Sequence, residues 1–169
     1  MVIIKTLIFT LLLPGVFLVL VPYFLLSWFG DGFTVEIGSF RYFGVLPVLL
    51  GILIYIQCAW SFASLGKGTP APIDPPKELV VKGLYKYVRN PMYLGVLFLL
   101  IGEVIFFGSL LIFLYSALVF LCFHIFVVIY EEPHLRARFG DLYNIYCDSV
   151  PRWIPRWRKT RKKGWEHEK

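Results

Sequence analysis

The sequence predicts an all-α integral membrane protein with about four transmembrane helices and a C-terminal amphipathic helix in the membrane interface. Apolar residues make up 58% of its 169 residues and charged residues only 17%, whereas soluble domains have about 45–50% and about 25%. Four apolar stretches with at most one charged residue each approach the roughly 20 residues that a bilayer core requires. A soluble domain of this size could not bury so much apolar surface. This excludes a soluble enzyme, a disordered chain and an ordinary nucleic-acid-binding module.

The first apolar stretch runs from about residue 6 to residue 29 and contains no charged residue. Lys5 precedes it, as in a signal peptide. However, the stretch exceeds the apolar region of a signal peptide, which has about 7–15 residues, and no small-residue cleavage site follows it. We therefore expect a transmembrane helix, with a kink at Pro14 and Gly15.

The other three apolar stretches cover about residues 43–65, 92–107 and 110–130. Only Gly108 and Ser109 separate the last two, which predicts a tight antiparallel hairpin. The stretch 92–107 is shorter than about 20 residues. It spans a bilayer only if it tilts little or begins within the preceding loop.

The distribution of Lys and Arg predicts the orientation of these spans. Of the 17 Lys and Arg, nearly all lie in the loop between the second and third spans or after the fourth span. Cytoplasmic segments carry such an excess of positive charge. We expect the central loop, the tail and both termini to face the cytoplasm. The inner membrane of a bacterium is the simplest location, because no cleavable targeting segment is visible.

The segment after the fourth span has apolar residues at helical spacing, and Pro133 stands where a first helical turn tolerates proline. The apolar positions are Leu135, Phe139, Leu142, Tyr143 and Tyr146. This pattern predicts an amphipathic helix in the membrane interface. Trp153, Trp157 and the basic residues beyond them suit an anionic headgroup surface. For the basic tail, a role in setting topology is favoured over a dedicated partner site.

These features divide the chain into an N-terminal two-helix membrane segment (1–65), a core (66–155) and a basic tail (156–169). The core begins with a long cytoplasmic loop that is stiffened by prolines, and long ordered loops are usually functional. The three cysteines have neither pairing nor metal-ligand spacing, so we predict no disulfide and no metal site.

The beginning of the third span has two interpretations of equal weight. Asn90 is a good N-cap residue and Pro91 suits the first helical turn. The pair is either a capped helix start, with Arg89 reaching to lipid headgroups, or a helix N-terminus that binds a polar or anionic ligand group.

Three polar residues in the spans or directly after them are candidates for function. Glu103 is a carboxylate inside the third span, where carboxylates usually have a function, but its position near the far end favours a structural, locally paired residue. His124 and Glu131 are seven residues apart on one helix face. Glu131 with Glu132 suits a cation or an amine, and the alternative is contact with water or arginines. For His124 the alternative is a hydrogen-bonded interior histidine.

Small residues mark one face of the third span. Gly95 and Gly102 share this face, and small residues let a neighbouring helix or a ligand come close. We predict that they leave a groove that admits a lipid-anchored acceptor laterally, between the third and fourth spans.

The chain resembles the integral-membrane methyltransferases that include isoprenylcysteine carboxyl methyltransferase and the phospholipid methyltransferases. The resemblance covers roughly residues 66–155 and depends on four sequence blocks in order. The blocks are Gly66-Lys67-Gly68-Thr69-Pro70, Leu79-Val80 with Gly83-Leu84-Tyr85, Arg89-Asn90-Pro91-Met92-Tyr93-Leu94-Gly95, and Glu131-Glu132 with Phe139-Gly140, Tyr143, Tyr146 and Val150-Pro151.

The resemblance implies an S-adenosyl-L-methionine site without a Rossmann domain, in a pocket formed by the last membrane helices and the cytoplasmic segments. The cofactor-binding residues that it implies are Lys77, Glu78, Leu79, Val80, Tyr85, Asn90, Pro91, Met92, Tyr93 and Glu131. Arg89 is a catalytic candidate, and Asn90 replaces the histidine usual in the family. Val127 stands where the prenylcysteine-specific enzymes have an arginine for the substrate. We therefore assign His124 as the catalytic candidate that orients the acceptor.

Taken together, the residues and the resemblance predict a membrane methyltransferase that uses S-adenosyl-L-methionine and acts on a lipophilic or lipid-anchored acceptor, with O-methyl transfer favoured. The alternatives are a phospholipid N-methyltransferase and a non-enzymatic membrane scaffold with a degenerate cofactor pocket. The expected partners are the acceptor and membrane lipids, with no nucleic acid and no metal.

Overall fold

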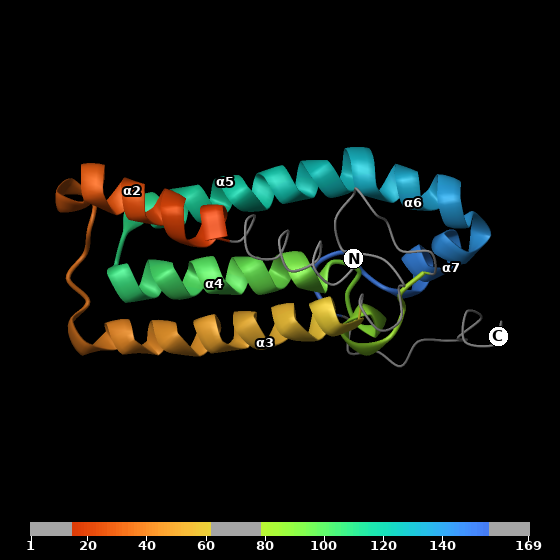
Figure 1. Ribbon diagram of the computed structural model, residues 1–169, viewed down its shortest axis with the longest axis horizontal. Helices are drawn as coiled ribbons and strands as arrows, with labels where there is room; N and C mark the ends of the chain where they lie inside the picture. Colours follow the sequence, from red (N-terminus) through yellow and green to blue (C-terminus); the bar gives the residue numbers. More distant parts are fainter. Residues whose placement is uncertain (1–14, 62–78, 156–169) are drawn as a thin grey trace, which may run out of the picture.

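The computed structural model describes residues 15–61 and 79–155, and helices dominate both ranges (Figure 1). No strand occurs in these ranges, where one isolated bridge joins Thr34 to Ser109. In chain order the elements, with η for π and 3-10 helices, are η1 (Val16–Leu20), α2 (Val21–Phe29), η2 (Gly30–Gly32), η3 (Gly38–Gly44), α3 (Val45–Ser61), η5 (Gly83–Lys86), α4 (Pro91–Phe107), α5 (Leu110–Phe126), η6 (Val127–Glu131), α6 (Glu132–Phe139) and α7 (Asp141–Ser149).

Helices α3, α4 and α5 lie side by side along the long axis, and α2 packs beside α5 (Figure 1). At one end are the turn between α4 and α5 and the segment that joins α2 to α3. At the other end are η5, α6 and α7, around the start of α4. The predicted all-α class is therefore confirmed for the described residues.

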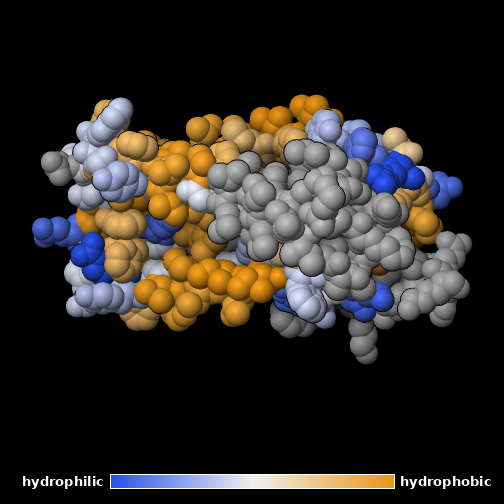
Figure 2. All heavy atoms as spheres, viewed as in Figure 1, coloured by the Kyte–Doolittle hydropathy of each residue, from blue (hydrophilic) through white to orange (hydrophobic). Residues whose placement is uncertain are grey.

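Two helices of the described ranges are long and apolar enough to cross a membrane, Gly38–Ser61 and Leu110–Phe139. Only 17% and 22% of their most apolar windows are buried, which suits contact with lipid and not the core of a soluble protein. Figure 2 shows the same division, with hydrophobic residues across the middle of the visible face and hydrophilic residues at both ends. Val16–Phe29 and Pro91–Phe107 are apolar but shorter, and the first predicted span begins outside the described residues.

Glycines allow α3 and α4 to touch backbone to backbone. A Cβ atom on Gly51 would lie 2.6 Å from the carbonyl oxygen of Gly95, and one on Gly102 would lie 2.7 Å from that of Gly44. The glycine face of α4 is therefore filled by α3. The predicted groove between the third and fourth spans is wrong in this respect, because those glycines serve helix packing.

The predicted single amphipathic helix after the fourth span is also wrong. Helix α5 continues through the π-helical turn η6 into α6. The helix then ends at Gly140, whose φ of +54° is a backbone conformation that glycine adopts easily. In α7, Tyr143 and Tyr146 are buried and pack against Leu79 and neighbouring apolar residues. The two tyrosines of α7 are thus covered by the protein, whereas Leu142 and Ile145 of the same helix stay exposed.

Candidate functional site

The first pair of predicted site residues meets where α4 begins and α5 ends. Tyr93, in the first turn of α4, donates a hydrogen bond of 2.8 Å from its hydroxyl to Oε2 of Glu131. Glu131 is the last residue of the π-helical turn η6. Such turns add a residue to a helix and occur frequently at functional sites. The contact with α4 is thus made from a turn of this kind.

An aromatic cluster surrounds this pair. It consists of Tyr93, Phe120, Phe123, His124 and Trp153. Ring centroids lie 4.7 Å apart for Tyr93 and Phe123, 6.4 Å for Tyr93 and Trp153, and 5.3 Å for Phe120 and Trp153. The cluster joins α4, α5 and the segment after α7, and Tyr93 connects it to the carboxylate of Glu131.

The hydrogen bond between Trp153 and His124 determines which nitrogen of the histidine is protonated. Nε1 of Trp153 lies 3.1 Å from Nδ1 of His124. Indole N–H only donates, so Nδ1 must accept. The neutral imidazole therefore carries its proton on Nε2, which is left as a donor. The prediction that Trp153 meets lipid headgroups is wrong, because the half-buried indole packs on His124 within the protein.

Glu132 is the centre of a second, ionic cluster. Its residue exposure is 5%, and both carboxylate oxygens accept from Arg152, at 2.7 Å from Nε and 3.0 Å from Nη2. Nη1 of Arg89 lies 3.1 Å from Oε1, and the more exposed Arg136 lies 4.0 Å from Oε2. Bidentate charge-assisted bonds are strong. The sequence left open whether the carboxylate pair binds a cation or contacts arginines. Glu132 contacts arginines, whereas Glu131 contacts Tyr93.

Arg89 and Asn90 fasten the start of α4 to the segment after α7. The backbone N–H of Arg89 donates to the carbonyl of Pro151 at 2.9 Å, and Nδ2 of Asn90 donates to that of Arg152 at 3.3 Å. Asn90 occupies the N-cap position, but its side chain makes no capping bond. The capped-start interpretation is wrong for its side chain, because the amide bonds to residue 152.

The Nε–H group of the Arg89 guanidinium is a buried donor without a partner in the described part of the chain. Nη1 lies 2.7 Å from Sγ of Cys147 and also contacts Glu132, so the side chain does not reach to headgroups. A buried donor without a partner is costly, which makes this Nε–H group a candidate for binding an anionic group.

Several of the remaining predicted cofactor residues belong to a buried apolar cluster. Val80 and Tyr85 pack with Cys58 of α3, and Met92 packs against them. The Tyr146 hydroxyl donates to the carbonyl of Tyr85 at 2.7 Å. Burial raises the pKa of both phenols, so they stay neutral. Lys77 and Glu78 lie outside the described residues.

The other residues singled out from the sequence are buried or half-buried, but each has different contacts. Pro91 is fully buried, Leu79 packs against α7, and Val127, at the arginine position of the prenylcysteine enzymes, is 1% exposed. Glu103 lies ten residues along α4 from Tyr93, about 15 Å away. Its Oε2 is buried without a hydrogen-bond partner among the described residues. The expected local pairing of Glu103 is therefore not found for this oxygen.

Sequence analysis missed the roles of three residues. Trp153 and Arg152 come from a segment read as headgroup-facing, and Glu132 was not separated from Glu131. The Val150-Pro151 block directly before Arg152 was the available signal, since it belongs to the resemblance. The contacts themselves join residues 20 to 62 positions apart, which no local pattern shows.

Comparison with known proteins identifies the class. The family model for phospholipid methyltransferases matches residues 40–142, more than half of the chain. This range includes α3, α4, α5 and the Tyr93–Glu131 pair. The chain belongs to the phospholipid methyltransferase family, a family of methyltransferases. The resemblance drawn from the four sequence blocks is thereby confirmed.

One curated relative adds detail. The protein-S-isoprenylcysteine O-methyltransferase of Schizosaccharomyces pombe is 36% identical over 77 residues. The match covers 46% of this chain and 33% of the relative. The chain thus matches about a third of the length of that enzyme.

Proposed function

We propose that this protein is a membrane methyltransferase that uses S-adenosyl-L-methionine and transfers its methyl group to a lipophilic acceptor, with O-methyl transfer favoured. The observation that carries the proposal is the hydrogen bond between Tyr93 of the aromatic cluster and Glu131 at the end of η6. The proposed arrangement has four spans, with the loop before α4, the tail and both termini in the cytoplasm. The excess of Lys and Arg in these segments supports it.

The residues of the site fit the charges of the cofactor. One oxygen of Glu131 accepts from Tyr93, and the other has no hydrogen bond in the described part of the chain, so it suits the amino group. The buried Nε of Arg89 suits the carboxylate. Rings of the aromatic cluster suit a sulfonium, because aromatic faces attract cations. We retain Leu79, Val80, Tyr85 and residues 90–92 as the proposed wall, and Lys77 and Glu78 as predictions.

In this proposal the protein contributes mainly by positioning the acceptor next to the cofactor. S-adenosyl-L-methionine, when bound, supplies an electrophilic methyl group. The side chains must orient the acceptor atom and keep water away from it. The buried cluster around Glu132 holds Arg89 for this purpose.

The protonation of His124 supports a carboxylate acceptor. Its Nδ1 accepts from Trp153, so its Nε2–H is the group left for a ligand. A donor stabilises a carboxylate oxygen, and a carboxylate needs no base before methylation. An amine acceptor must first lose a proton, and Nδ1 is not free to take it. We therefore keep His124 as the residue that orients the acceptor.

The comparisons and Val127 rank the candidates for the acceptor and for the function. The S. pombe relative is named for isoprenylcysteine, but Val127 offers no arginine clamp for that carboxylate. We expect weak binding of a prenylcysteine and favour another lipid-anchored carboxylate. The family match supports phospholipid N-methylation as the second candidate. A scaffold with an empty pocket is the third.

Two assays on purified protein in detergent test the proposal. Calorimetry with S-adenosyl-L-methionine and with its demethylated product should detect binding, and no binding of either would favour the scaffold. A labelled methyl donor should then be offered with a prenylcysteine, an aminophospholipid and a total membrane lipid extract. We expect label in the lipid extract. Efficient transfer to the prenylcysteine would show that Val127 was misinterpreted, and transfer to the aminophospholipid alone would favour N-methylation.

A further inference from the structure

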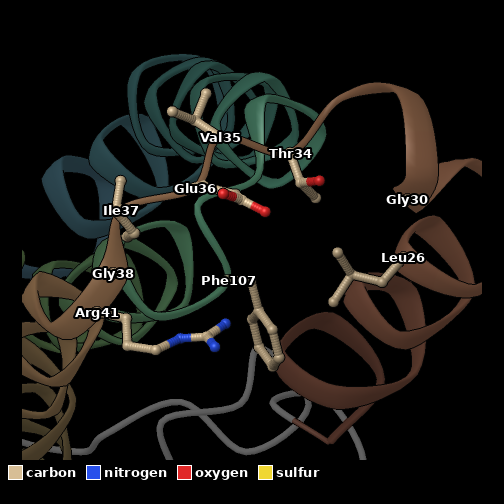
Figure 3. Close-up of a pocket in the computed structure, with 9 residues that line it drawn as sticks. All are labelled: Leu26, Gly30, Thr34, Val35, Glu36, Ile37, Gly38, Arg41 and Phe107. Carbon is tan, nitrogen blue, oxygen red and sulfur yellow. The ribbon is translucent and has the colours of Figure 1, made fainter.

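A cavity lies at the opposite end of the bundle from Tyr93 and Glu131. It has a volume of about 550 Å³ and lies between the end of α2, the segment 34–41 and the end of α4. Figure 3 shows its lining, with Leu26 and Phe107 as apolar walls. Ligand pockets have volumes of about 300–1,000 Å³. The size of this cavity therefore suits a small molecule or a lipid headgroup.

Two opposite charges line the cavity. The carboxylate of Glu36 and the guanidinium of Arg41 both extend into it (Figure 3). Nε of Arg41 donates to the carbonyl of Phe106 at 3.1 Å, and the guanidinium lies 5.5 Å from the centre of the Phe106 ring. These contacts hold the guanidinium in place and leave its two terminal nitrogens for a ligand. Among the described residues, no ion pair joins Glu36 to Arg41 and no hydrogen bond is made by the Glu36 carboxylate.

The segment that carries Glu36 is fixed to the turn between α4 and α5. The N–H of Val35 donates to the carbonyl of Gly108 at 2.8 Å, and that of Leu110 donates to Phe33 at 2.9 Å. Gly108 has a φ of +60°, and a Cβ atom there would collide with the carbonyl oxygen of Val35. The carboxylate is therefore presented from a braced backbone and the cavity is preformed.

Exposed aromatic residues place the cavity at the level of lipid headgroups. Trp28, Phe40 and Tyr42 are 75%, 73% and 66% exposed on the elements that flank it. Trp and Tyr gather where a membrane meets water. The apolar helix α2 and the span Gly38–Ser61 continue from this level into the membrane, so a lipid that binds here can keep its chains among them.

We propose that this cavity binds the zwitterionic headgroup of an aminophospholipid, with the phosphate at Arg41 and the ammonium at Glu36. A cavity with Arg41 alone would favour anionic lipids, whereas the two opposite charges favour a headgroup that carries both. The site is separate from the methyltransferase site at the other end of α4 and does not depend on the function proposed for it. The bound lipid is a structural ligand held at the junction of α2, α4 and the connecting segment.

Native mass spectrometry of the full chain tests this with added phosphatidylethanolamine or phosphatidylglycerol. We expect one phosphatidylethanolamine to bind at least about threefold more tightly than phosphatidylglycerol, as for a pair of partly exposed charges. Arg41→Gln should weaken both lipids by a similar factor. Glu36→Gln should weaken only phosphatidylethanolamine and should remove the preference. Arg138→Gln, at the other end of the bundle, is the control that should change neither.

Other outcomes overturn the proposal. Equal binding of the two lipids by the wild type, or an unchanged preference in Glu36→Gln, would show that the charges do not select the headgroup. Soluble phosphoethanolamine should bind far more weakly than the lipid, and equal affinity would assign the cavity to a free zwitterion. S-adenosyl-L-methionine binding should be the same in Glu36→Gln as in the wild type. Its loss there would show that the two ends are not separate.

Discussion

The charge on Glu131 is the residue-scale feature that the proposed function needs most. Glu131→Gln keeps the shape and the contact with Tyr93 but removes the negative charge. Loss of a charge-assisted hydrogen bond costs about 1.5–3 kcal/mol, so affinity for S-adenosyl-L-methionine should fall by about one to two decades. Calorimetry measures this directly.

Tyr93→Phe is the matched comparison for Glu131→Gln, since it removes only a neutral donor. The loss of this donor should weaken cofactor binding by about 1 kcal/mol, which is less than the effect of Glu131→Gln. Unchanged affinity in Glu131→Gln, with the protein folded, would remove Glu131 from the cofactor site.

Trp153 has a different residue-scale role, because it acts through His124. Trp153→Phe keeps a ring beside Phe120 but removes the N–H that Nδ1 of His124 accepts. The imidazole is then free to change tautomer, and we expect kcat to fall by about 2–10-fold, the value of one neutral hydrogen bond. Cofactor affinity should stay the same. The measurement is a steady-state assay on the acceptor that the lipid screen identifies.

The kinetic parameters separate this positioning role from simple packing. If Trp153 only fills space, Trp153→Phe should leave kcat unchanged. If it holds the histidine as a donor to the acceptor, kcat should fall while the KM for the cofactor stays the same. Full activity in Trp153→Phe would contradict the proposed role of His124.

At the scale of elements, Glu132 ties α6 to the start of α4 and to the segment after α7. Removing one partner of a buried ion pair leaves the others uncompensated and costs about 3–5 kcal/mol. Glu132→Ala should therefore lower the free energy of unfolding by that amount. Denaturant unfolding in detergent measures it.

Arg136→Gln is the control for Glu132→Ala. The Arg136 side chain is 55% exposed and lies 4.0 Å from Oε2 of Glu132, so its loss should cost less than about 1 kcal/mol. Equal effects of the two substitutions would mean that the cluster is solvated and does not hold the elements together.

The glycine contact between α3 and α4 is the second feature at this scale. A methyl group at Gly102 would meet backbone atoms of Gly44 and Val48, and backbone cannot move aside cheaply. Gly102→Ala should cost about 1–3 kcal/mol through overpacking. Thermal unfolding measures the loss against Gly32→Ala, where nothing lies within 4 Å of the added atom. A stable Gly102→Ala protein would mean that the two helices are not held in close contact.

At the scale of the whole molecule, the proposed orientation places the two ends of the bundle on opposite sides of the membrane. Val35 and Tyr87 lie at opposite ends and are 65% and 58% exposed. In a Cys122→Ser background, Val35→Cys should react with an impermeant thiol reagent from outside intact cells. Tyr87→Cys should react only after the membrane is opened. Reaction of Tyr87→Cys in intact cells would invert the topology.

The sequence by itself determined the helical class, the family and the hairpin at Gly108, because these follow from composition, short motifs and local spacing. Apolar stretches and turn residues act within a few positions of one another. The same local information named Tyr93, Glu131 and His124 as candidates, without showing that Trp153 and Tyr93 are their partners.

The tertiary structure alone decided the partners. The glycine face of α4 packs against α3, and the tyrosines of α7 are buried by other parts of the protein. Packing brings complementary surfaces together whatever their distance in sequence. Glu131 and Glu132 are neighbours in a helical segment and point to different sides of it. Glu131 meets Tyr93 of α4, whereas Glu132 meets Arg89 and Arg152. No pattern of apolar residues in the sequence encodes these long-range contacts.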